Sequence, residues 1–371
     1  MERVRHLAAA PSGEPLDDPS VYERNVENFV GTVHVPVGLA GPLAVDGEAA
    51  HGAYYVPLAT TEAALVASYS RGATLLTAAG GCTARVLDAR MRRAPAFAFA
   101  DLREAVAAAA WIRQNEARLR RAAESTSRHA RLLEIGTAVE GNQLYLDCAY
   151  ATGEAAGQNM VTFATEALCG ELLAHLPVRP RAFAVESNAS GDKKATARAL
   201  LATRGRRVCA DATVPAALLE ARLRVTPAAL AAYWRTGAVA AAMTGTIGMQ
   251  GMYANALAAF YLATGQDVAC VAESAVGITR LDVAPDGALY ASVTMPNVVV
   301  ATVGGGTGLP TQRAAARILA RGGEPPTADA LAEIVAAIVL AGEISLTASL
   351  CAHEFSSAHR RFAREGAGAA S

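Results

Sequence analysis

The chain has 371 residues, of which 52% are hydrophobic, 18% charged and 5% aromatic, and its formal net charge is −1. That length is enough for two domains and a large core, whereas the balanced charge and scarce aromatic residues argue against a nucleic-acid-binding surface. The six cysteines lie far apart without a CxxC pair, so we expect buried free thiols in a reducing cytoplasm rather than disulfides or a metal site.

The N-terminal part is predicted to contain a polar leader followed by strands. Residues 1–27 are polar and lack the apolar core of a secretory signal near their start. Short apolar runs alternate with turn residues through residues 28–60, which is typical of strands and turns. A helix is predicted to begin at Thr60, with Glu62 in its first turn, and to end at Gly80.

The middle of the chain predicts a small α+β insert. Strands are expected at residues 95–100, 143–147 and 182–185, and helices from Asp101 and over residues 157–175. This alternation suits an insert between two halves of a larger domain. We therefore predict a discontinuous large domain, residues 28–93 and 185–371, around an inserted domain at residues 94–184.

The C-terminal half is expected to be mostly helical from Ala195 to a β-rich stretch at residues 289–303. Residues 236–266 carry no charge and are long enough to cross a bilayer, but glycines interrupt them. We expect them to form a tightly packed core segment and not a membrane span. Residues 329–365 have only Gly342 as an internal breaker, and their apolar spacing predicts one long buried helix.

Lys193 and Lys194 are the only lysines in the chain. Adjacent ammonium groups repel each other, so they need a nearby anion, such as Asp192, another carboxylate or a bound ligand. Such a cluster could hold an anionic substrate or stabilise an oxyanion, and it could also be a solvated turn.

Three further side chains are candidates for acid–base chemistry. Glu62 lies in an apolar context, where it could act as a general acid or be an ordinary capping-turn carboxylate. Asp267 ends the charge-free stretch, so it either faces solvent or pairs with a buried cation such as Lys193 or Lys194. His359 could donate a proton near neutral pH or be a surface histidine of a basic helical tail.

Two glycine runs, residues 153–157 and 304–308, could bring backbone N–H groups close to a phosphate or could form tight turns. Neither has GxGxxG spacing at a first βα turn, so a Rossmann fold has little support.

Taken in chain order, these segments resemble the catalytic portion of the 3-hydroxy-3-methylglutaryl-coenzyme A (HMG-CoA) reductases, of the type found in eukaryotes, archaea and some actinobacteria. The resemblance extends from about Glu27 to Arg364, and the ordered set of motifs is highly specific. The matching segments are residues 27–31, 36–43, 57–62 (with Ala63 where the family has glycine), 153–160, 192–194, 265–267 and 302–307.

The resemblance implies a four-electron, NADPH-dependent reduction of HMG-CoA to mevalonate and free CoA. Glu62 would donate a proton to the carbonyl oxygen, and Lys193 would stabilise the developing oxyanion. Asp267 would lie against Lys193, and His359 would protonate the departing CoA thiolate. Each of the two hydride transfers develops charge on the same oxygen, so one ammonium group can serve both.

The resemblance also implies binding roles. For the substrate these are Arg93 and Lys194 at the acyl carboxylate, Asp192 beside them, Asn255 in support of the catalytic cluster, and Ser68 and Arg71 at CoA. Ser127 and Arg128 would grip the 2′-phosphate of NADPH, which implies NADPH over NADH. The other implied cofactor-binding residues are Glu154, Gly157, Asn159, Met160, Gly304, Gly305, Gly306 and Thr307.

The implied architecture is α+β. A large, mostly helical substrate-binding domain would carry an inserted ferredoxin-like cofactor-binding domain. The active site would be completed across the interface of a homodimer, or a dimer of dimers, in a cytoplasmic enzyme without a metal, a membrane or a nucleic acid partner.

Besides Ala63, three positions depart from the family pattern. Glu154 replaces an aspartate, Gln158 replaces a methionine, and Glu186 stands where the family has a serine that touches the substrate carboxylate. A second anion there would oppose an acidic acyl chain unless Arg93 or Lys194 neutralises it, although Glu186 could also be rotated away or exposed. Two alternatives therefore stay open: a divergent NADPH-dependent reductase of another acyl thioester, or a non-catalytic CoA- or nucleotide-binding homologue.

Overall fold

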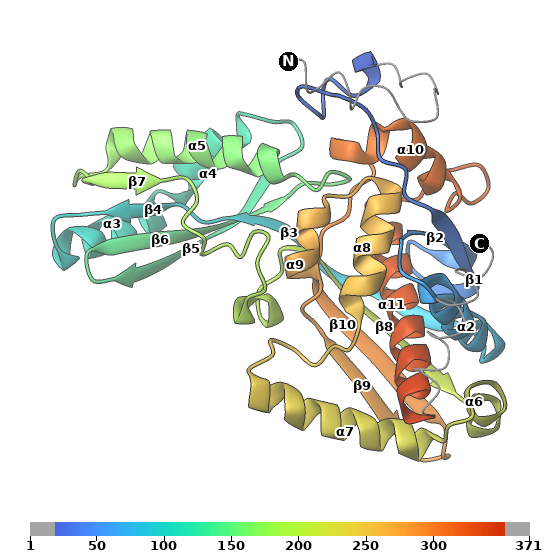
Figure 1. Ribbon diagram of the computed structural model, residues 1–371. Helices are drawn as coiled ribbons and strands as arrows, with labels where there is room; N and C mark the ends of the chain where they lie inside the picture. Colours follow the sequence, from blue (N-terminus) through green and yellow to red (C-terminus); the bar gives the residue numbers. More distant parts are fainter. Residues whose placement is uncertain (1–18, 353–371) are drawn as a thin grey trace.

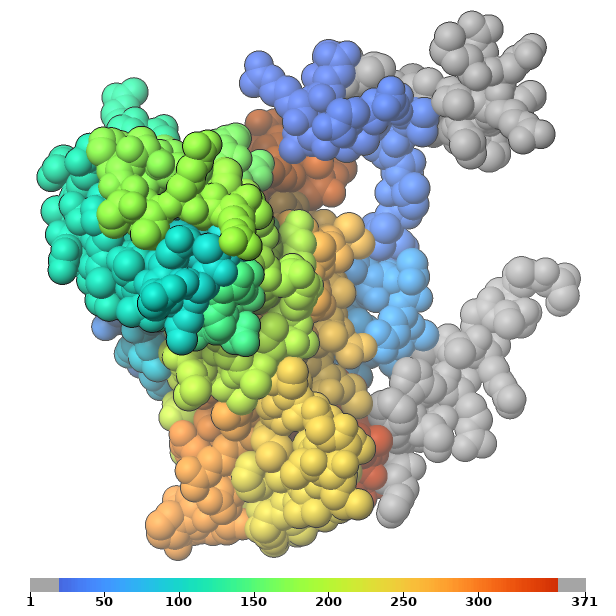
Figure 2. All heavy atoms as spheres, turned by 90° about the vertical axis from the view of Figure 1, so that its left-hand side faces the viewer, coloured from blue at the N-terminus to red at the C-terminus, as the bar shows by residue number. Residues whose placement is uncertain are grey.

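The computed structural model describes residues 19–352 of the chain. It has a large lobe and a smaller one, which stands to the left in Figure 1 and faces the viewer in Figure 2. A ten-stranded sheet runs through both lobes, with its main path in the order β7-β4-β6-β3-β8-β10-β9. The combination of this sheet with packed helices confirms the α+β class.

The N-terminal part forms the strands that the sequence predicts. After the short helix η1 (Pro19–Val21), strands β1 (Val37–Gly47) and β2 (His51–Ala59) pair antiparallel. Helix α2 (Leu65–Ala78) follows.

The predicted start of α2 was wrong. Its N-cap is Ala64, which has a φ of 67° and makes no side-chain cap. Glu62 lies in the preceding turn, where its N–H donates to the Thr60 hydroxyl at 3.0 Å. Glu62 is therefore outside the first turn of the helix, and its carboxylate is free to face another element.

Strand β3 (Cys82–Arg93) connects the two lobes. Most of it pairs antiparallel with β8 (Gly205–Val214), and its start runs parallel to the end of β1. Its last residues, 91–93, pair instead with β6 (Gln143–Ala151) of the small lobe. Arg93, at the end of β3, thus lies where the lobes meet.

The small lobe contains the predicted strands and helices together with one strand that was not predicted. Strands β4 (Ala96–Ala98), β5 (Arg131–Glu140) and β7 (Ala182–Ala184) join β6 in the spatial order β7-β4-β6-β5, and all the pairings are antiparallel. The dense charge of residues 113–131, which lead into β5, obscured its strand character. The helices are α3 (Leu102–Gln114), capped by the Asp101 side chain, α4 (Glu116–Glu124) and α5 (Gln158–His175).

This β-α-β-β-α-β order, with α3 and α4 in the first helical connection, is the order of ferredoxin-like folds. The domain boundaries at residues 93 and 184 stay a prediction.

The expectation of a mostly helical segment after Ala195 was wrong at two strands. Strand β8 and strand β9 (Ile278–Val283) flank β10 (Leu289–Val298) in the large sheet. In β8, buried Val208 and Ala210 alternate with half-buried polar residues, and this alternation was the missed signal. The helical elements of this segment are η2 (Ala197–Leu200), α6 (Ala216–Leu223), α7 (Pro227–Thr244), α8 (Tyr253–Thr264), η3 (Val268–Cys270) and α9 (Val271–Ser274).

Only the second part of the charge-free stretch at residues 236–266 is buried as expected. Helix α8 packs inside the large lobe, with eight buried residues. Helix α7 lies on the surface, where it is drawn in yellow in Figures 1 and 2. Its Val239 and Met243 side chains are 62% and 82% exposed, so this helix presents an apolar face to its surroundings.

The predicted long buried helix is confirmed over α11 (Ala328–Cys351), which packs against α2, α8 and the large sheet. Among the described residues, α11 is the one helix long and apolar enough to cross a membrane, and 78% of its most apolar window is buried inside the molecule. That burial fits a core helix. The remaining elements are η4 (Gly305–Gly308) and α10 (Pro310–Arg317).

Candidate active site

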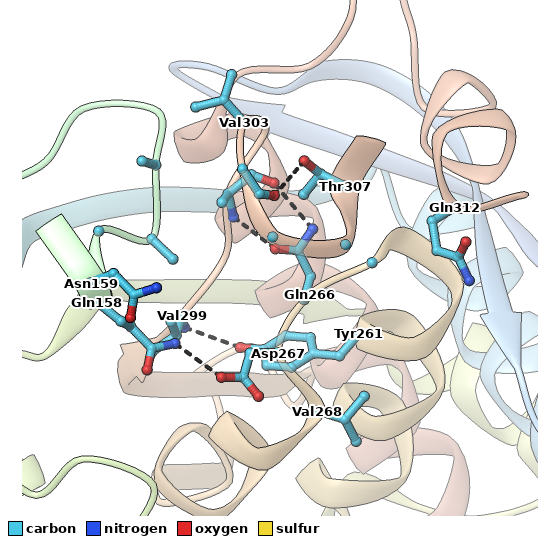
Figure 3. A pocket seen from close by; sticks show the side chains of 18 of the residues that line it. Gln158, Asn159, Tyr261, Gln266, Asp267, Val268, Val299, Val303, Thr307 and Gln312 are labelled. Atoms are coloured by element: carbon cyan, nitrogen blue, oxygen red, sulfur yellow. Dashed lines mark hydrogen bonds between the residues drawn. The ribbon is translucent and has the colours of Figure 1, made fainter. Parts of the chain in front are cut away.

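A cavity of about 680 Å³ lies between the N-terminus of α5 and the C-terminus of α8 (Figure 3). Its wall consists of residues 155–160, Lys193, residues 265–268 and residues 303–307, with single residues Tyr261, Leu262, Val299, Ala301, Leu309 and Gln312. The small lobe thus contributes one side of the cavity and the large lobe the other. The two glycine runs noted in the sequence meet here.

Glycines allow the backbone segments of this cavity to approach one another. A Cβ on Gly265 would lie 2.3 Å from the Gly306 carbonyl oxygen, and one on Gly157 would lie 2.4 Å from Thr152. Both glycines have a positive φ, which only glycine adopts at little cost. A Cβ on Gly304 or Gly305 would instead meet no atom within 4 Å, so the backbone of these two residues borders open space.

Lys193 and Asp267 form an ion pair in this cavity, with Nζ and Oδ2 2.9 Å apart. The hydrogen bond from Lys193 therefore favours the charged form of both groups. It raises the pKa of Lys193, against the opposing effect of burial. Burial pushes the pKa of Asp267 upward, but the Lys193 ammonium outweighs burial and lowers it.

Asp267 has further partners that fix its carboxylate. Its Oδ1 accepts the N–H of Ala269 at 3.1 Å, which caps η3, and its Oδ2 accepts the Gln158 side-chain amide at 3.2 Å. Figure 3 shows Gln158 and Asp267 pointing toward each other. Gln158, noted in the sequence only as a departure, thus extends the ion pair to the small lobe.

Beneath this pair lies a buried charge network. Arg204 and Glu273 are 1% and 0% exposed, and Arg204 Nη1 is 2.5 Å from Glu273 Oε1. Arg204 Nη2 lies 2.7 Å from Asp192 Oδ1. Burial raises the pKa of Glu273. Burial alone would lower the pKa of Arg204, but the carboxylates of Glu273 and Asp192 outweigh it and raise the pKa of the guanidinium.

Arg93 is held by two carboxylates at the edge of the network. Its Nη1 lies 3.1 Å from Asp192 Oδ2 and 3.3 Å from Glu186 Oε2, and its Nη2 donates to the Gln158 carbonyl at 3.1 Å. Glu186 is therefore neither exposed nor rotated away. Lys194 Nζ, in contrast, donates only to the Asp192 carbonyl, at 2.9 Å, among the described residues.

Glu62 and Asn255 form a second, separate cluster. The Asn255 side-chain amide donates to Glu62 Oε2 at 2.9 Å, and Asn255 lies in the first turn of α8. Asp267 follows the other end of α8. The helix rises about 14 Å between Asn255 and Thr264, so within one chain Glu62 lies well away from Lys193.

The residues matched to CoA binding lie on the side of Glu62. Ser68 and Arg71 are three residues apart on α2 and share a face. The Arg71 guanidinium donates to the Ser345 hydroxyl at 3.0 Å and to the Ser345 carbonyl at 2.8 Å, which ties α2 to α11. His359 follows α11 and lies outside the described residues.

The matched cofactor residues separate into two groups. Gly157, Asn159, Met160 and the 304–307 loop line the cavity. Glu154 does not, because its Oε2 accepts the Thr302 hydroxyl at 2.8 Å and the Ala328 N–H at the start of α11 at 2.7 Å.

Ser127 and Arg128 also lie outside the cavity wall, in the turn between α4 and β5. There the Ser127 hydroxyl accepts the His129 N–H at 3.1 Å.

The model of the hydroxymethylglutaryl-coenzyme A reductase family matches residues 3–364. The chain belongs to this family. It is 44% identical to the 3-hydroxy-3-methylglutaryl-coenzyme A reductase of Haloferax volcanii over 98% of this chain and 92% of that protein. It is 46% identical to the same-named reductase of Halobacterium salinarum over 94% of this chain and 87% of that protein.

Solved reductase structures share the fold. The class II enzyme of Streptococcus pneumoniae, bound to NADPH in open conformations, aligns with a TM-score of 0.74 at 22% identity, over 94% of this chain and 96% of that one. The family model and the relatives at 44% and 46% identity confirm the resemblance in the sequence as family membership.

Family motifs did not reveal Arg204 and Glu273, the most buried charges of the site. One signal was present, because Glu273 is the only charged residue between Val268 and Gly277. A lone carboxylate in such an apolar run indicates a buried partner. Within residues 19–352, no group of three His, Cys, Asp or Glu side chains is placed to hold a metal ion.

Proposed function

We propose that this protein reduces HMG-CoA to mevalonate and free CoA with two molecules of NADPH. The observation that carries this proposal is the Lys193–Asp267 ion pair in the wall of a cavity built from two glycine-rich segments. An ammonium group held charged at a fixed place is the feature that stabilises an oxyanion. The 40–46% identity to archaeal relatives named as this reductase supports the same reaction.

The cavity fits a dinucleotide cofactor. The N-terminus of α5 opens into it without a side-chain cap, so its first N–H groups are available to an anion. The backbone around Gly304 and Gly305 borders open space. We propose that residues 157–160 and 304–307 hold NADPH, with Ser127 and Arg128 at its 2′-phosphate.

The chain's own residues then divide the work. NADPH, when bound, supplies hydride to the carbonyl carbon of the thioester. Lys193 donates a hydrogen bond to the oxygen on which charge develops, and Asp267 keeps that ammonium charged and oriented. Glu62 delivers the proton to this oxygen, and His359 protonates the CoA thiolate between the two reductions.

The test is to follow NADPH absorbance with purified protein and HMG-CoA. We expect two NADPH oxidised per CoA released, and turnover that depends on Lys193. A folded protein whose rate does not exceed that of Lys193→Ala, or which oxidises one NADPH per CoA, contradicts the proposal.

We further propose a dimer in which Lys193 of one subunit meets Glu62 of the partner subunit. The length of α8 between the two clusters and the exposed apolar face of α7 support this arrangement. A cytoplasmic location completes the proposal, supported by six free thiols.

Subunit mixing tests the dimer. Glu62→Gln and Lys193→Ala proteins are each expected to be inactive. After unfolding and refolding together they regain about a quarter of wild-type activity, because half the dimers are mixed and each mixed dimer has one intact site. Equal mixing without any recovery contradicts the shared site.

A second candidate substrate class has one specific observation in its favour. Glu186 lies against Arg93, the residue matched to the acyl carboxylate. This contact supports a reductase of an acyl thioester without that carboxylate. Glu186→Ser raising kcat/KM for HMG-CoA by about tenfold favours this alternative, whereas efficient wild-type turnover of HMG-CoA removes it. NADPH binding without turnover of any thioester would instead indicate a non-catalytic homologue.

A further inference from the structure

Lys193 is held at two points by one short segment. Its Nζ pairs with Asp267 at 2.9 Å, and its backbone N–H donates to Glu273 Oε1 at 3.1 Å. Asp267 caps η3, and η3 continues directly into α9, which carries Glu273. Both contacts therefore originate from a single helical unit, residues 267–274.

The backbone of Lys193 needs such a contact. Its φ is 56°, in the left-handed region that residues with a Cβ disfavour. Without a partner for its N–H, the residue would relax toward a negative φ. That rotation would redirect the Cα–Cβ bond and carry the ammonium group away from Asp267.

Glu273 is itself immobilised. It is fully buried, and Arg204 holds its Oε1 at 2.5 Å. Arg204 is fixed in turn, because its backbone N–H donates to Asn297 Oδ1 on β10 at 2.9 Å. The same guanidinium lies 2.7 Å from Asp192 Oδ1, next to Lys193 in the chain. Strand β10 is thus connected to the loop of Lys193 through Arg204 and the carboxylates of Glu273 and Asp192.

We infer that Glu273 is a positioning residue for Lys193: it fixes the lysine main chain so that the ammonium group reaches Asp267 and the cavity. The contact to the backbone N–H carries this effect, and the pairing with Arg204 keeps the carboxylate in place. The inference rests on the proposed function only in taking Lys193 as the catalytic cation.

Two substitutions separate positioning from stability. Glu273→Asp keeps the negative charge that pairs with Arg204, but the side chain is one methylene shorter, which withdraws the acceptor oxygen from the Lys193 N–H and from Arg204. Glu273→Gln keeps the length and an acceptor oxygen but removes the charge. We expect Glu273→Gln to be the less stable variant in thermal unfolding and Glu273→Asp to have the lower kcat, by about tenfold. The KM for HMG-CoA stays within about threefold of wild type.

Because the chain has only two lysines, their side chains give a second readout. Protein labelled with ¹⁵N-lysine shows two Nζ signals by NMR. In Glu273→Asp the Lys193 signal shifts, while the Lys194 signal does not. The matched control is Glu220→Asp, on the exposed surface of α6, which shifts neither signal and leaves kcat unchanged.

The outcomes decide the inference separately from the reaction. If the variant with the lower kcat is also the less stable one, Glu273 has a structural role only. An unshifted Lys193 signal in Glu273→Asp also overturns the inference. If the wild type fails to reduce HMG-CoA, the proposed function fails, and the Nζ signals still test the positioning role. If one variant does not fold, the Lys193 Nζ signal of the other decides. The inference requires this signal to shift in Glu273→Asp and to keep its wild-type position in Glu273→Gln.

Discussion

The two ends of α8 differ in how their charged residues are held. At the C-terminal end, Lys193, Asp267, Arg204 and Glu273 form charge pairs with distances of 2.9 Å and 2.5 Å. At the N-terminal end, the exposed Glu62 carboxylate accepts one hydrogen bond, from Asn255. The chain thus holds the proposed catalytic cation with several of its own side chains and holds the proposed proton donor with one.

This difference suits the two tasks proposed for the residues. A cation that stabilises an oxyanion works best when its position needs no rearrangement during the reaction. A proton donor must exchange its proton with solvent between turnovers, and exposure allows that exchange. The comparison therefore predicts that substitutions at the C-terminal end have the larger effects on stability.

The largest effect is expected for Arg204→Ala. This change leaves Glu273 without its buried cation and Asp192 with Arg93 alone. Removing one partner of a buried pair costs about 3–5 kcal/mol. Urea unfolding measures the loss, with Arg222→Ala on the exposed surface of α6 as the control. A loss no larger than that of the control would mean that the network adds nothing to stability.

Lys193→Ala is expected to lower kcat by about 10²–10³-fold, the effect of removing one oxyanion donor. Lys194→Ala is the matched comparison, because this ammonium forms no ion pair within residues 19–352. It should raise the KM for HMG-CoA and change kcat little. Steady-state kinetics of the two variants distinguish the roles, and equal losses of kcat would contradict the division between them.

The sequence predicts several of the residues in this comparison, but it does not predict the contacts between residues far apart in the chain. The motifs identified Glu62, Lys193 and Asp267. The local sequence left open whether Asp267 faces solvent or a cation, and the family resemblance implied that it lies against Lys193. The structure has the ion pair. Strand β8 could have been recognised from its alternation. The contact of Arg204 with Glu273 joins residues 69 positions apart.

Such a contact depends on how β8, β10 and α9 pack, which no local pattern encodes. The same limit applies to the left-handed Ala64, which sets the start of α2 and frees Glu62 from the helix. Nothing in the local sequence marks that residue for a positive φ.

Asn255→Ala tests the lightly held end. Loss of the single hydrogen bond to Glu62 should lower kcat by about tenfold, equal to about 1.4 kcal/mol. Because the contact is exposed, the free energy of unfolding should change by less than about 0.5 kcal/mol. Asn255→Asp sharpens the test, because an ionised carboxylate cannot donate this hydrogen bond, and kcat should fall at least as far as in Asn255→Ala. Wild-type kcat in both variants would remove Asn255 from the site.

The smallest effect is expected from the pH dependence of the Lys193–Asp267 pair. Both side chains are partly exposed, 43% and 37%, so the pair contributes only about 0.5–1 kcal/mol. The pKa of Lys193 is raised, so its contribution is complete below the unfolded lysine value of about 10.4 and is lost as pH rises through the folded value. The pKa of Asp267 is lowered, so its contribution is complete above about 3.9 and is lost as pH falls through the folded value.

The difference in unfolding free energy between wild type and Asp267→Asn should therefore be constant from about pH 5 to pH 9 and shrink on both sides. A difference that changes near neutral pH would mean that another group, rather than this pair, governs the charge state of Lys193. Asp267 would then not be the group that holds the Lys193 cation, and the contrast between the two ends of α8 would fail.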